Sequence, residues 1–408
     1  MIPKKSGYGR SGVLWPTWVH AENFKSIRTL SLDLRPFMVF VGPNAAGKTN
    51  LVQAVALLFD LLGEGTTEPV ELYGGLEQLI RRAQRRTRHI ALGAMFETRL
   101  PPVQHAAHRP GAVTLEHRLR LTPSASPGDV RVGIETVRIL KPDQTVGLQC
   151  MWRNGRVVKL EASGEWKAWA PLLDQQQPDP RAVNCARLLK IVGIRVPSLK
   201  RLRLDASALR QDSDLTTLRR SYRLGPAGEG LPLAVERLHK TGRLTSILAG
   251  LREVYPRITG VEPVHVLPGR IGLAFNEGSI RGPLGTANVS DGVMHALALL
   301  VALESGGPLA IEEPENALHP WALRKLLATA QKREVSGPLL LTTHSPVVVD
   351  AVTDPANLYI VEHSASAGTT VAAAVEKESA LRAILSESGQ TLGQVWLGGG
   401  LGGVPGEG

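Results

Sequence analysis

Cysteine is nearly absent from this chain of 408 residues, which contains only Cys150 and Cys185. Two cysteines are too few for a disulfide framework or a cysteine-based zinc cluster. Long apolar runs are missing as well, because a run such as Val293–Leu303 is far shorter than the ~20 residues that span a bilayer. The first residues, Met1–Ser6, lack the apolar segment of a secretory signal. We therefore expect a cytoplasmic protein that contacts no membrane.

The sequence also lacks internal repeats and long heptad runs, which excludes a repeat protein and an extended coiled-coil arm. Its composition, with 21% charged and 43% hydrophobic residues, is that of an ordinary globular protein. The formal net charge of +10 suits a polyanionic partner. Arginine is densest in residues 81–89 and 195–223. Each segment is either a solvated helix face or a surface that contacts a phosphate backbone.

A strand, a glycine-rich loop and a helix follow one another in the N-terminal part of the chain. The apolar run Met38–Val41 leads into the loop Gly42–Thr49, which is Gly-Pro-Asn-Ala-Ala-Gly-Lys-Thr, and a helical pattern covers Asn50–Leu62. This is the P-loop motif in the setting that it requires. A chance glycine-rich turn would not be expected to have all three parts in this order. The segment therefore predicts a site for a nucleoside triphosphate.

The residue types of this loop have defined roles toward phosphate. Gly42 and Gly47 let the backbone curve so that its N–H groups point at phosphate oxygens, and the following helix adds the positive end of its dipole. Lys48 is expected to reach the β- and γ-phosphates, and the Thr49 hydroxyl to bind Mg²⁺. The predicted ATP-binding residues here are Gly42, Pro43, Asn44, Ala45, Ala46, Gly47, Lys48, Thr49 and Asn50.

Two adjacent carboxylates follow a second short apolar strand. The run Pro308–Ile311 ends at Glu312 and Glu313. In a Walker B arrangement, Glu312 would hold the Mg²⁺ shell and Glu313 would polarise the attacking water. The alternative is an ordinary helix start with acidic residues in its first turn. The P-loop upstream favours the Walker B interpretation.

Two further segments carry candidate phosphate-binding residues. The continuous apolar run that ends before His344 is typical of a buried parallel strand, which would deliver this side chain to the γ-phosphate. Ser290 precedes the apolar helix pattern Val293–Leu303 and is a good N-cap. The same helix N-terminus, with Ser290 and Gly292, can also bind phosphate.

Five motifs in this order resemble a known family. They are Asn-Phe-Lys-Ser at 23–26, the P-loop at 42–49, Ser-Asp-Gly at 290–292, Glu-Glu-Pro-Glu-Asn-x-Leu-His-Pro at 312–320 and Thr-Thr-His-Ser-Pro at 342–346. The set resembles the ABC-type ATPases of the SMC, RecF and OLD group. It is most similar to their compact AAA-type "predicted ATPase" members, which have neither a coiled coil nor a TOPRIM domain. The resemblance covers about residues 16–100 and 230–400.

This resemblance implies an α/β fold: an ABC-type P-loop ATPase head with a mixed or parallel core sheet, an antiparallel β subdomain and a helical insertion. We expect an N-terminal ATPase lobe at 1–165, a helical insertion or lid at 166–258 and a C-terminal ATPase lobe at 259–408. Local patterns predict strand pairs at 18–34 and 264–275, strands at 91–100, 113–121 and 130–140, and helices at 76–88, 182–192 and 231–254.

In the family, two ATPase heads enclose two ATP molecules. The resemblance implies that Glu312 binds Mg²⁺, that Glu313 is the general base and that His344 is the switch histidine. Ser290 and Gly292 would contact the γ-phosphate of the opposite subunit. Together with Lys48, Glu313 and His344 form the predicted catalytic set, and Thr49 and Glu312 form the predicted metal site.

Other family positions match less completely. Asn316–His319 would form the D-loop at the dimer interface, and the Q-loop glutamine is either Gln78 or Gln84, with Gln78 favoured. Glu312 stands where many ABC ATPases have aspartate. Asp291 replaces the first glycine of the transporter-type signature, and a carboxylate beside a γ-phosphate is repulsive unless it turns away.

An ATPase core does not identify what the protein acts on. The resemblance and the basic segments suggest a homodimer or a higher oligomer that senses or clamps nucleic acid and controls a separately encoded effector, as in antiphage defence. The alternatives are a RecF-like DNA-repair clamp and a transporter ATPase subunit, which the non-transporter signature disfavours. An intrinsic nuclease is not expected, because only about 60 residues follow His344.

Overall fold

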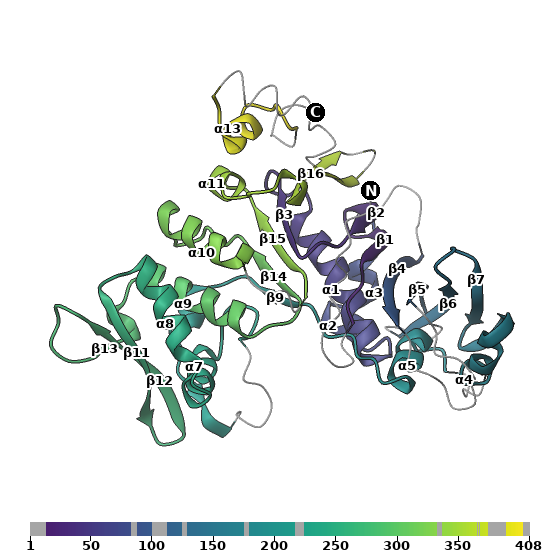
Figure 1. Ribbon diagram of the computed structural model, residues 1–408, viewed down its shortest axis with the longest axis horizontal. Coiled ribbons are helices and arrows are strands. Elements are labelled where there is room, and N and C mark those ends of the chain that lie inside the picture. Colours follow the sequence, from purple (N-terminus) through teal and green to yellow (C-terminus); the bar gives the residue numbers. More distant parts are fainter. Residues whose placement is uncertain are drawn as a thin grey trace. The chain divides into compact units, whose positions relative to one another are not determined.

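The computed structural model describes residues 14–82, 88–99, 112–124, 129–174, 179–216, 224–332, 337–364, 366, 368–373 and 389–402. The chain divides into two compact units (Figure 1), each made of segments that are distant in sequence. Unit 1 contains residues 1–36, 44–199 and 361–371, and unit 2 contains residues 37–43, 200–360 and 372–408. Among the described residues, no helix combines the length and the apolar character that crossing a membrane needs.

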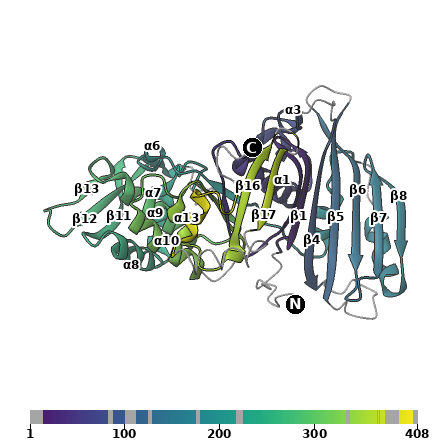
Figure 2. The same ribbon diagram turned by 90° about the horizontal axis from the view of Figure 1, so that it is seen from above.

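Unit 1 is built on an antiparallel sheet with the strand order β8-β7-β6-β5-β4-β1-β2 (Figure 2). Its strands are β1 (Trp18–Phe24), β2 (Ile27–Asp33), β4 (Ile90–Arg99), β5 (Ala112–Pro123), β6 (Val130–Leu140), β7 (Val146–Arg153) and β8 (Arg156–Ala162). Strand β17 (Gly368–Ala373) lies parallel to β2. Buried residues alternate with more exposed ones along β5, as expected for a sheet with one face against a core. The predicted strand pair at 18–34 and the three predicted strands after it are confirmed.

The helices of unit 1 are mostly short, except for the one that follows the P-loop. They are α1 (Lys48–Glu64), α2 (Pro69–Leu72), α3 (Leu76–Leu79), α4 (Ala170–Asp174), α5 (Asn184–Ile191) and a 3₁₀ helix at Gly164–Trp169. The helix predicted at 76–88 is wrong beyond Leu79, because Ile80 is extended and pairs with Phe24. Pairing with the β1–β2 turn therefore overrides the local helical pattern, and residues 83–87 lie outside the described part of the chain.

A buried carboxylate fixes the start of α5 in unit 1. Glu135 accepts hydrogen bonds from the backbone N–H groups of Asn184 (2.8 Å) and Cys185 (2.9 Å), and His117 Nε2 lies 2.9 Å from it. The carboxylate thus satisfies donors that every helix N-terminus leaves unpaired. Burial, reinforced by the charge of Glu135, raises the pKa of Cys150 to about 12, so this thiol stays protonated at neutral pH.

Unit 2 contains a parallel sheet with the strand order β16-β3-β15-β14-β9. The strands are β3 (Phe37–Val41), β9 (Lys200–Leu202), β14 (Leu309–Glu312), β15 (Leu339–Thr343) and β16 (Leu358–Ser364). Every residue of β3, β14 and β15 is buried, as the predicted parallel core requires. Strand β9 was not predicted. It lies in the segment expected to be a helical insertion, and three residues are too few to show a period.

Helices and a second, smaller sheet complete unit 2. The helices are α6 (Ala206–Leu209), α7 (Leu231–Lys240), α8 (Leu244–Val254), α9 (Asp291–Glu304), α10 (Pro320–Lys332), α11 (Pro346–Asp350) and α13 (Leu392–Leu397), with 3₁₀ helices at Thr286–Asn288 and Pro355–Asn357. The small sheet contains β10 (Ser213–Asp214), β11 (Ile258–Leu267), β12 (Arg270–Glu277) and β13 (Leu284–Gly285). The strand pair predicted at 264–275 is confirmed by β11 and β12, and a turn at Thr241–Arg243 divides the helix predicted at 231–254.

The Glu135 network predicts a large effect on stability. Replacing Glu135 with Ala should lower the free energy of unfolding by about 3 kcal/mol, because it leaves buried donors without their acceptor. Urea denaturation would measure the change. Glu161→Ala is the control, since Glu161 forms an exposed ion pair with Lys159 and its loss should have little effect. Equal effects of the two substitutions would contradict a structural role for Glu135.

Candidate active site

The parallel strands of unit 2 end at one edge of the sheet, and a candidate functional residue follows each of four strands. Strand register brings the ends of β3, β9, β14 and β15 to nearly the same level. The residues that follow these strands are Gly42, Arg203, Glu313 and His344. Open α/β sheets bind ligands outside this carboxyl edge. The structure therefore brings together three residues predicted from sequence and one, Arg203, that was not predicted.

The two predicted Walker B carboxylates differ in their surroundings. Glu312 is the last residue of β14 and is buried. Glu313 has a φ of 52°, and its N–H donates to the carbonyl of Thr342 at 2.9 Å. A positive φ is unusual for a residue with a side chain and ends the regular strand. The Glu313 side chain consequently leaves the buried sheet and is 22% exposed.

Two donors hold the Glu313 carboxylate. Arg203 Nη2 lies 3.0 Å from Glu313 Oε2, and Asn316 Nδ2 donates to the same oxygen at 3.3 Å. Arg203 belongs to the arginine-dense segment 195–223, in which no motif or spacing distinguishes it from the other arginines. The structure thus assigns an intramolecular ion pair to one arginine of a segment predicted to be either a solvated helix face or a nucleic-acid surface.

Glu315 organises the chain after β15. Its Oε1 accepts hydrogen bonds from the Thr343 hydroxyl (2.7 Å) and the backbone N–H of His344 (3.1 Å). The His344 Nδ1 atom lies 3.4 Å from the same oxygen. The other carboxylate oxygen of Glu315 is buried and has no hydrogen-bond partner among the described residues. Glu315 therefore orients His344, a role that sequence analysis did not assign to it.

The predicted signature turn, Ser290–Gly292, contains the acidic Asp291. An arginine from another part of unit 2 balances its charge. Ser290 is the N-cap of α9, where its hydroxyl accepts from the N–H of Val293 at 3.4 Å. Arg210 Nη2 lies 2.5 Å from the Asp291 carboxylate. The same guanidinium donates to the carbonyls of Val289, at 2.7 Å, and Thr286. Arg210 was not predicted as a site residue, and it balances the negative charge that was unexpected in the signature.

Gly292 occupies a position with no room for a side chain. A Cβ atom there would lie 2.5 Å from the Tyr255 hydroxyl and 3.0 Å from the carbonyl of Ala317. Burial raises the pKa of Tyr255, so its hydroxyl stays protonated and can donate. The predicted importance of Gly292 thus has a steric basis within this unit.

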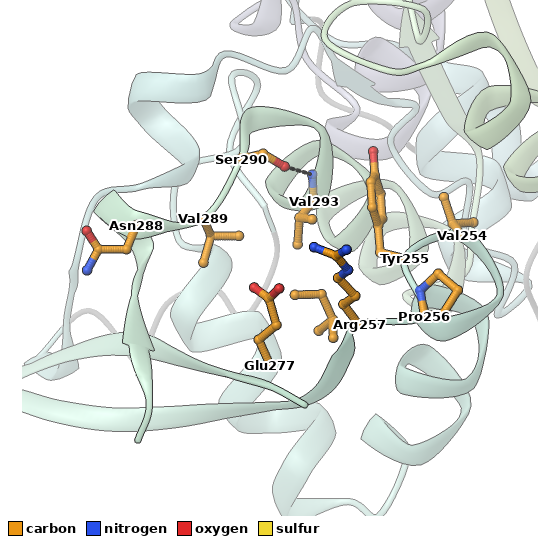
Figure 3. A pocket seen from close by; sticks show the side chains of 10 residues that line it. Val254, Tyr255, Pro256, Arg257, Glu277, Asn288, Val289, Ser290 and Val293 are labelled. Atoms are coloured by element: carbon orange, nitrogen blue, oxygen red, sulfur yellow. Dashed lines mark hydrogen bonds between the residues drawn. The ribbon is translucent and has the colours of Figure 1, made fainter. Parts of the chain in front are cut away.

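A pocket of about 350 Å³ lies beside Ser290, between the end of α8, the ends of β11 and β12 and the signature turn. Figure 3 shows that the guanidinium of Arg257 and the carboxylate of Glu277 point into it. Val254, Val289 and Val293 supply apolar lining. The pocket therefore combines one cationic and one anionic side chain beside Ser290.

The P-loop starts in unit 2, where β3 ends, and continues in unit 1 from Asn44 onward. Gly42 and Pro43 directly follow β3. Ala45 has a φ of 65° and Gly47, the N-cap of α1, has a φ of 100°. The left-handed backbone conformation of these two residues curls the chain as a phosphate-binding loop requires. Lys48 and Ala46 are buried, Asn44, Ala45 and Thr49 are exposed, and Gly47 and Asn50 are partly buried.

Hydroxyl groups from distant parts of unit 1 support this loop. Asn50 Nδ2 donates to Ser26 Oγ at 2.7 Å. The Thr369 hydroxyl donates to the carbonyl of Ala46 at 2.9 Å and lies 2.7 Å from Ser26 Oγ. A Cβ atom on Gly47 would lie 2.1 Å from Thr369 Oγ1. Thr369 was missed because nothing in its local sequence marks a residue 323 positions after its partner.

The remaining predicted site residues are the two candidate Q-loop glutamines and the predicted D-loop. Gln78 is exposed on α3, next to the β1–β2 turn, and Gln84 is outside the described residues. The segment Asn316–His319 connects β14 to α10 and contains Ala317 with a φ of 61°. His319 Nδ1 accepts from the N–H of Trp321 at 3.2 Å, which fixes the start of α10.

The two predicted metal ligands, Thr49 in unit 1 and Glu312 in unit 2, are each of a type that suits Mg²⁺. In the part of the chain that the structure describes, no three His, Cys, Asp or Glu side chains form a metal-binding group. Mg²⁺ usually keeps several waters and binds through one or two protein oxygens and substrate phosphates. The Thr49 hydroxyl and the Glu312 carboxylate are oxygen donors of this kind.

The P-loop, the parallel strands and their acidic carboxyl edge define a P-loop ATPase. A family model described as "AAA domain, putative AbiEii toxin, Type IV TA system" matches residues 37–98 and 164–350. The match spans more than half of the chain and includes the P-loop, the signature turn, both carboxylates and His344. The chain belongs to this family, which confirms the predicted class of AAA-type, ATP-binding ATPase.

Comparison with solved structures gives distant similarities. An SMC head bound to the C-terminal winged-helix domain of ScpA is 12% identical with a TM-score of 0.49, covering 90% of this chain and 99% of that one. A Pyrococcus furiosus SMC head with an extended coiled coil, bound to the C-terminal domain of ScpA, is 11% identical with a TM-score of 0.48. The match covers 91% of this chain and 99% of that one. The Thermotoga maritima SMC head is 13% identical with a TM-score of 0.37, covering 88% and 98%. No curated protein matches the chain.

The support of the P-loop by Thr369 predicts an effect on nucleotide affinity. Thr369→Val keeps the side-chain shape and removes the hydroxyl that holds Ala46. The lost hydrogen bond is worth about 1 kcal/mol, so the Kd for ATP should rise about fivefold. Calorimetric titration would measure it, with Thr370→Val as the control because Thr370 is the exposed neighbour on β17. An unchanged Kd would limit Thr369 to a role in stability.

Proposed function

We propose that this protein hydrolyses ATP with Mg²⁺ and that two copies enclose two ATP molecules. The observation that carries the proposal is the shared carboxyl edge, at which Glu312 ends β14, Glu313 follows it, and His344 follows the neighbouring parallel strand β15. Carboxylates at such an edge suit the metal shell and the attacking water of phosphoryl transfer. The P-loop directly follows a third strand of the same sheet.

Each proposed residue has a separate task. Lys48 and the backbone of the P-loop would bind the phosphates, and Thr49 and Glu312 would hold a Mg²⁺ ion, whose positive charge would offset the negative charge of the phosphates. Glu313 orients the water and accepts its proton. His344, positioned by Glu315, would contact the γ-phosphate. Catalysis of this kind depends mainly on placement and electrostatics.

The signature turn supports a role for the second copy. Ser290 presents the N-terminus of α9, and Gly292 keeps that turn free of a side chain. Asp291 would repel a γ-phosphate, but Arg210 offsets its charge within the same unit. The electrostatic objection to a phosphate at this turn is thereby reduced. Ser290 and Gly292 are the residues that would meet the γ-phosphate bound by the partner.

We further propose that the dimer binds nucleic acid and controls a separately encoded effector, as in antiphage defence. The net charge of +10 and the arginine-dense segment 81–89 support a polyanionic partner. Arg82 and Arg88 are exposed, whereas Arg85 and Arg86 lie outside the described residues. A RecF-like repair clamp would use the same surfaces. Dependence of ATP hydrolysis on a protein partner, rather than on DNA alone, would separate the two functions.

Replacing Glu313 with Gln should sharply reduce turnover while ATP binding remains. Glutamine keeps the shape of the side chain but cannot accept the proton from water, so hydrolysis should fall about a hundredfold or more. Phosphate release would measure turnover, and light scattering would detect the ATP-trapped dimer. Normal turnover would show that another group is the base.

Lys48→Ala is the matched comparison, because it should lose ATP binding itself. The two variants therefore separate binding from chemistry: Glu313→Gln should form ATP-dependent dimers, and Lys48→Ala should stay monomeric at every ATP concentration. Unchanged ATP affinity in Lys48→Ala would overturn the assignment of the P-loop.

The basic segment can be tested by charge reversal. The double variant Arg82→Glu and Arg88→Glu should bind duplex DNA more weakly, and the plot of log affinity against log salt should lose about two units of slope. Fluorescence anisotropy at several salt concentrations would measure both. Arg156→Glu, an exposed residue on β8, is the control. Identical behaviour of all three proteins would assign residues 81–89 to a solvated surface.

A further inference from the structure

Arg203 is the residue at the carboxyl edge that no motif includes. It directly follows β9, the strand next to β14, just as Glu313 directly follows β14. Parallel pairing between these strands places the two residues at neighbouring positions of the same edge. Their side chains meet there, with Nη2 of Arg203 3.0 Å from Oε2 of Glu313.

The contact fixes the orientation of the carboxylate. Arg203 and Asn316 both donate to Oε2 of Glu313, while the backbone N–H of Glu313 is bound to Thr342. Two donors on one oxygen favour one side-chain rotamer of Glu313 and one rotation of its carboxylate about the Cγ–Cδ bond. A group that must orient a water molecule needs such preorganisation.

The segment that carries Arg203 is itself held in place. The N–H of Arg203 donates to the carbonyl of Pro226 at 2.8 Å, and the N–H of Asp205 donates to Ala227 at 2.9 Å. Asp205 then caps α6 by accepting from Ser207 and Ala208. At the other end, Arg210 is bound to Asp291 and to the carbonyls before it. Arg203 therefore extends from a backbone that is anchored on both sides.

Stability is a weak reason for this ion pair. The Arg203 side chain is 63% exposed, and exposed pairs contribute little to folding. Its position beside the candidate base gives it a more specific consequence. In free energy, a small displacement of a reacting group costs the reaction much more than an exposed ion pair contributes to folding.

We propose that Arg203 is a positioning residue for ATP hydrolysis, which holds Glu313 in the orientation that engages the attacking water. The proposal rests on the proposed function, in particular on Glu313 as the base. Arg203 acts through Glu313 and needs no contact with ATP. Its loss therefore affects turnover and leaves nucleotide binding unchanged.

Arg203→Ala should lower kcat about tenfold and change the KM for ATP and the Kd of a non-hydrolysable analogue by less than twofold. Arg203→Lys should recover part of the lost kcat, since an ammonium can still donate to Oε2. Arg243→Ala is the matched control, because Arg243 forms an ion pair of similar exposure with Glu304 at the far end of α9. Its kcat should equal that of the unmodified protein.

A double variant shows whether Arg203 acts through the base. Adding Arg203→Ala to Glu313→Gln should cause no further loss of the residual rate. An additional loss, or a kcat of Arg203→Ala within twofold of normal or above it, would overturn the positioning role while leaving the proposed ATPase intact. Normal turnover of Glu313→Gln alone would instead overturn the assignment of the base, and this inference with it.

Discussion

The shared carboxyl edge of the parallel strands in unit 2 is the constraint on which the candidate site depends. Parallel strands point in one direction, so residues that follow β3, β9, β14 and β15 gather at one edge although they are far apart in sequence. The strands are buried on both faces, which fixes their register through packing. A change in that register would separate every pair of residues that the proposed chemistry needs together.

Charge at this edge is balanced by one short segment. Arg203 and Arg210 lie on either side of α6 and pair with Glu313 and Asp291. Without Arg203 the charge of Glu313 would be uncompensated at the edge, and without Arg210 the charge of Asp291 would be uncompensated at the signature turn; either is unfavourable where phosphates must bind. Arg210 thus explains how a chain with Asp291 in its signature can remain a candidate ATPase. The two arginines also give part of the arginine-dense segment 195–223 an intramolecular role.

The sequence predicted those parts of the site whose chemistry is local. A P-loop and paired carboxylates show their residue types and spacing within a few positions, and the apolar strands before them set the α/β class. Arg203, Arg210 and Thr369 could not be found in this way, because their partners are distant in sequence. Strand β9 has three residues and shows no period. The helix expected at 76–88 fails because Ile80 pairs with Phe24, a tertiary contact that local propensity does not contain.

The part of the P-loop that lies in unit 1 also depends on residues that are distant in sequence. Its glycine at position 47 has a positive φ, which favours glycine in any chain, and a Cβ there would also collide with Thr369. The motif therefore needs glycine for two reasons, of which only the first is visible in the motif. Thr369 in turn reaches Ala46 because β17 pairs with β2 beside the Ser26 turn. A strand that is distant in sequence therefore supports the nucleotide-binding loop through a hydrogen bond that the motif itself does not encode.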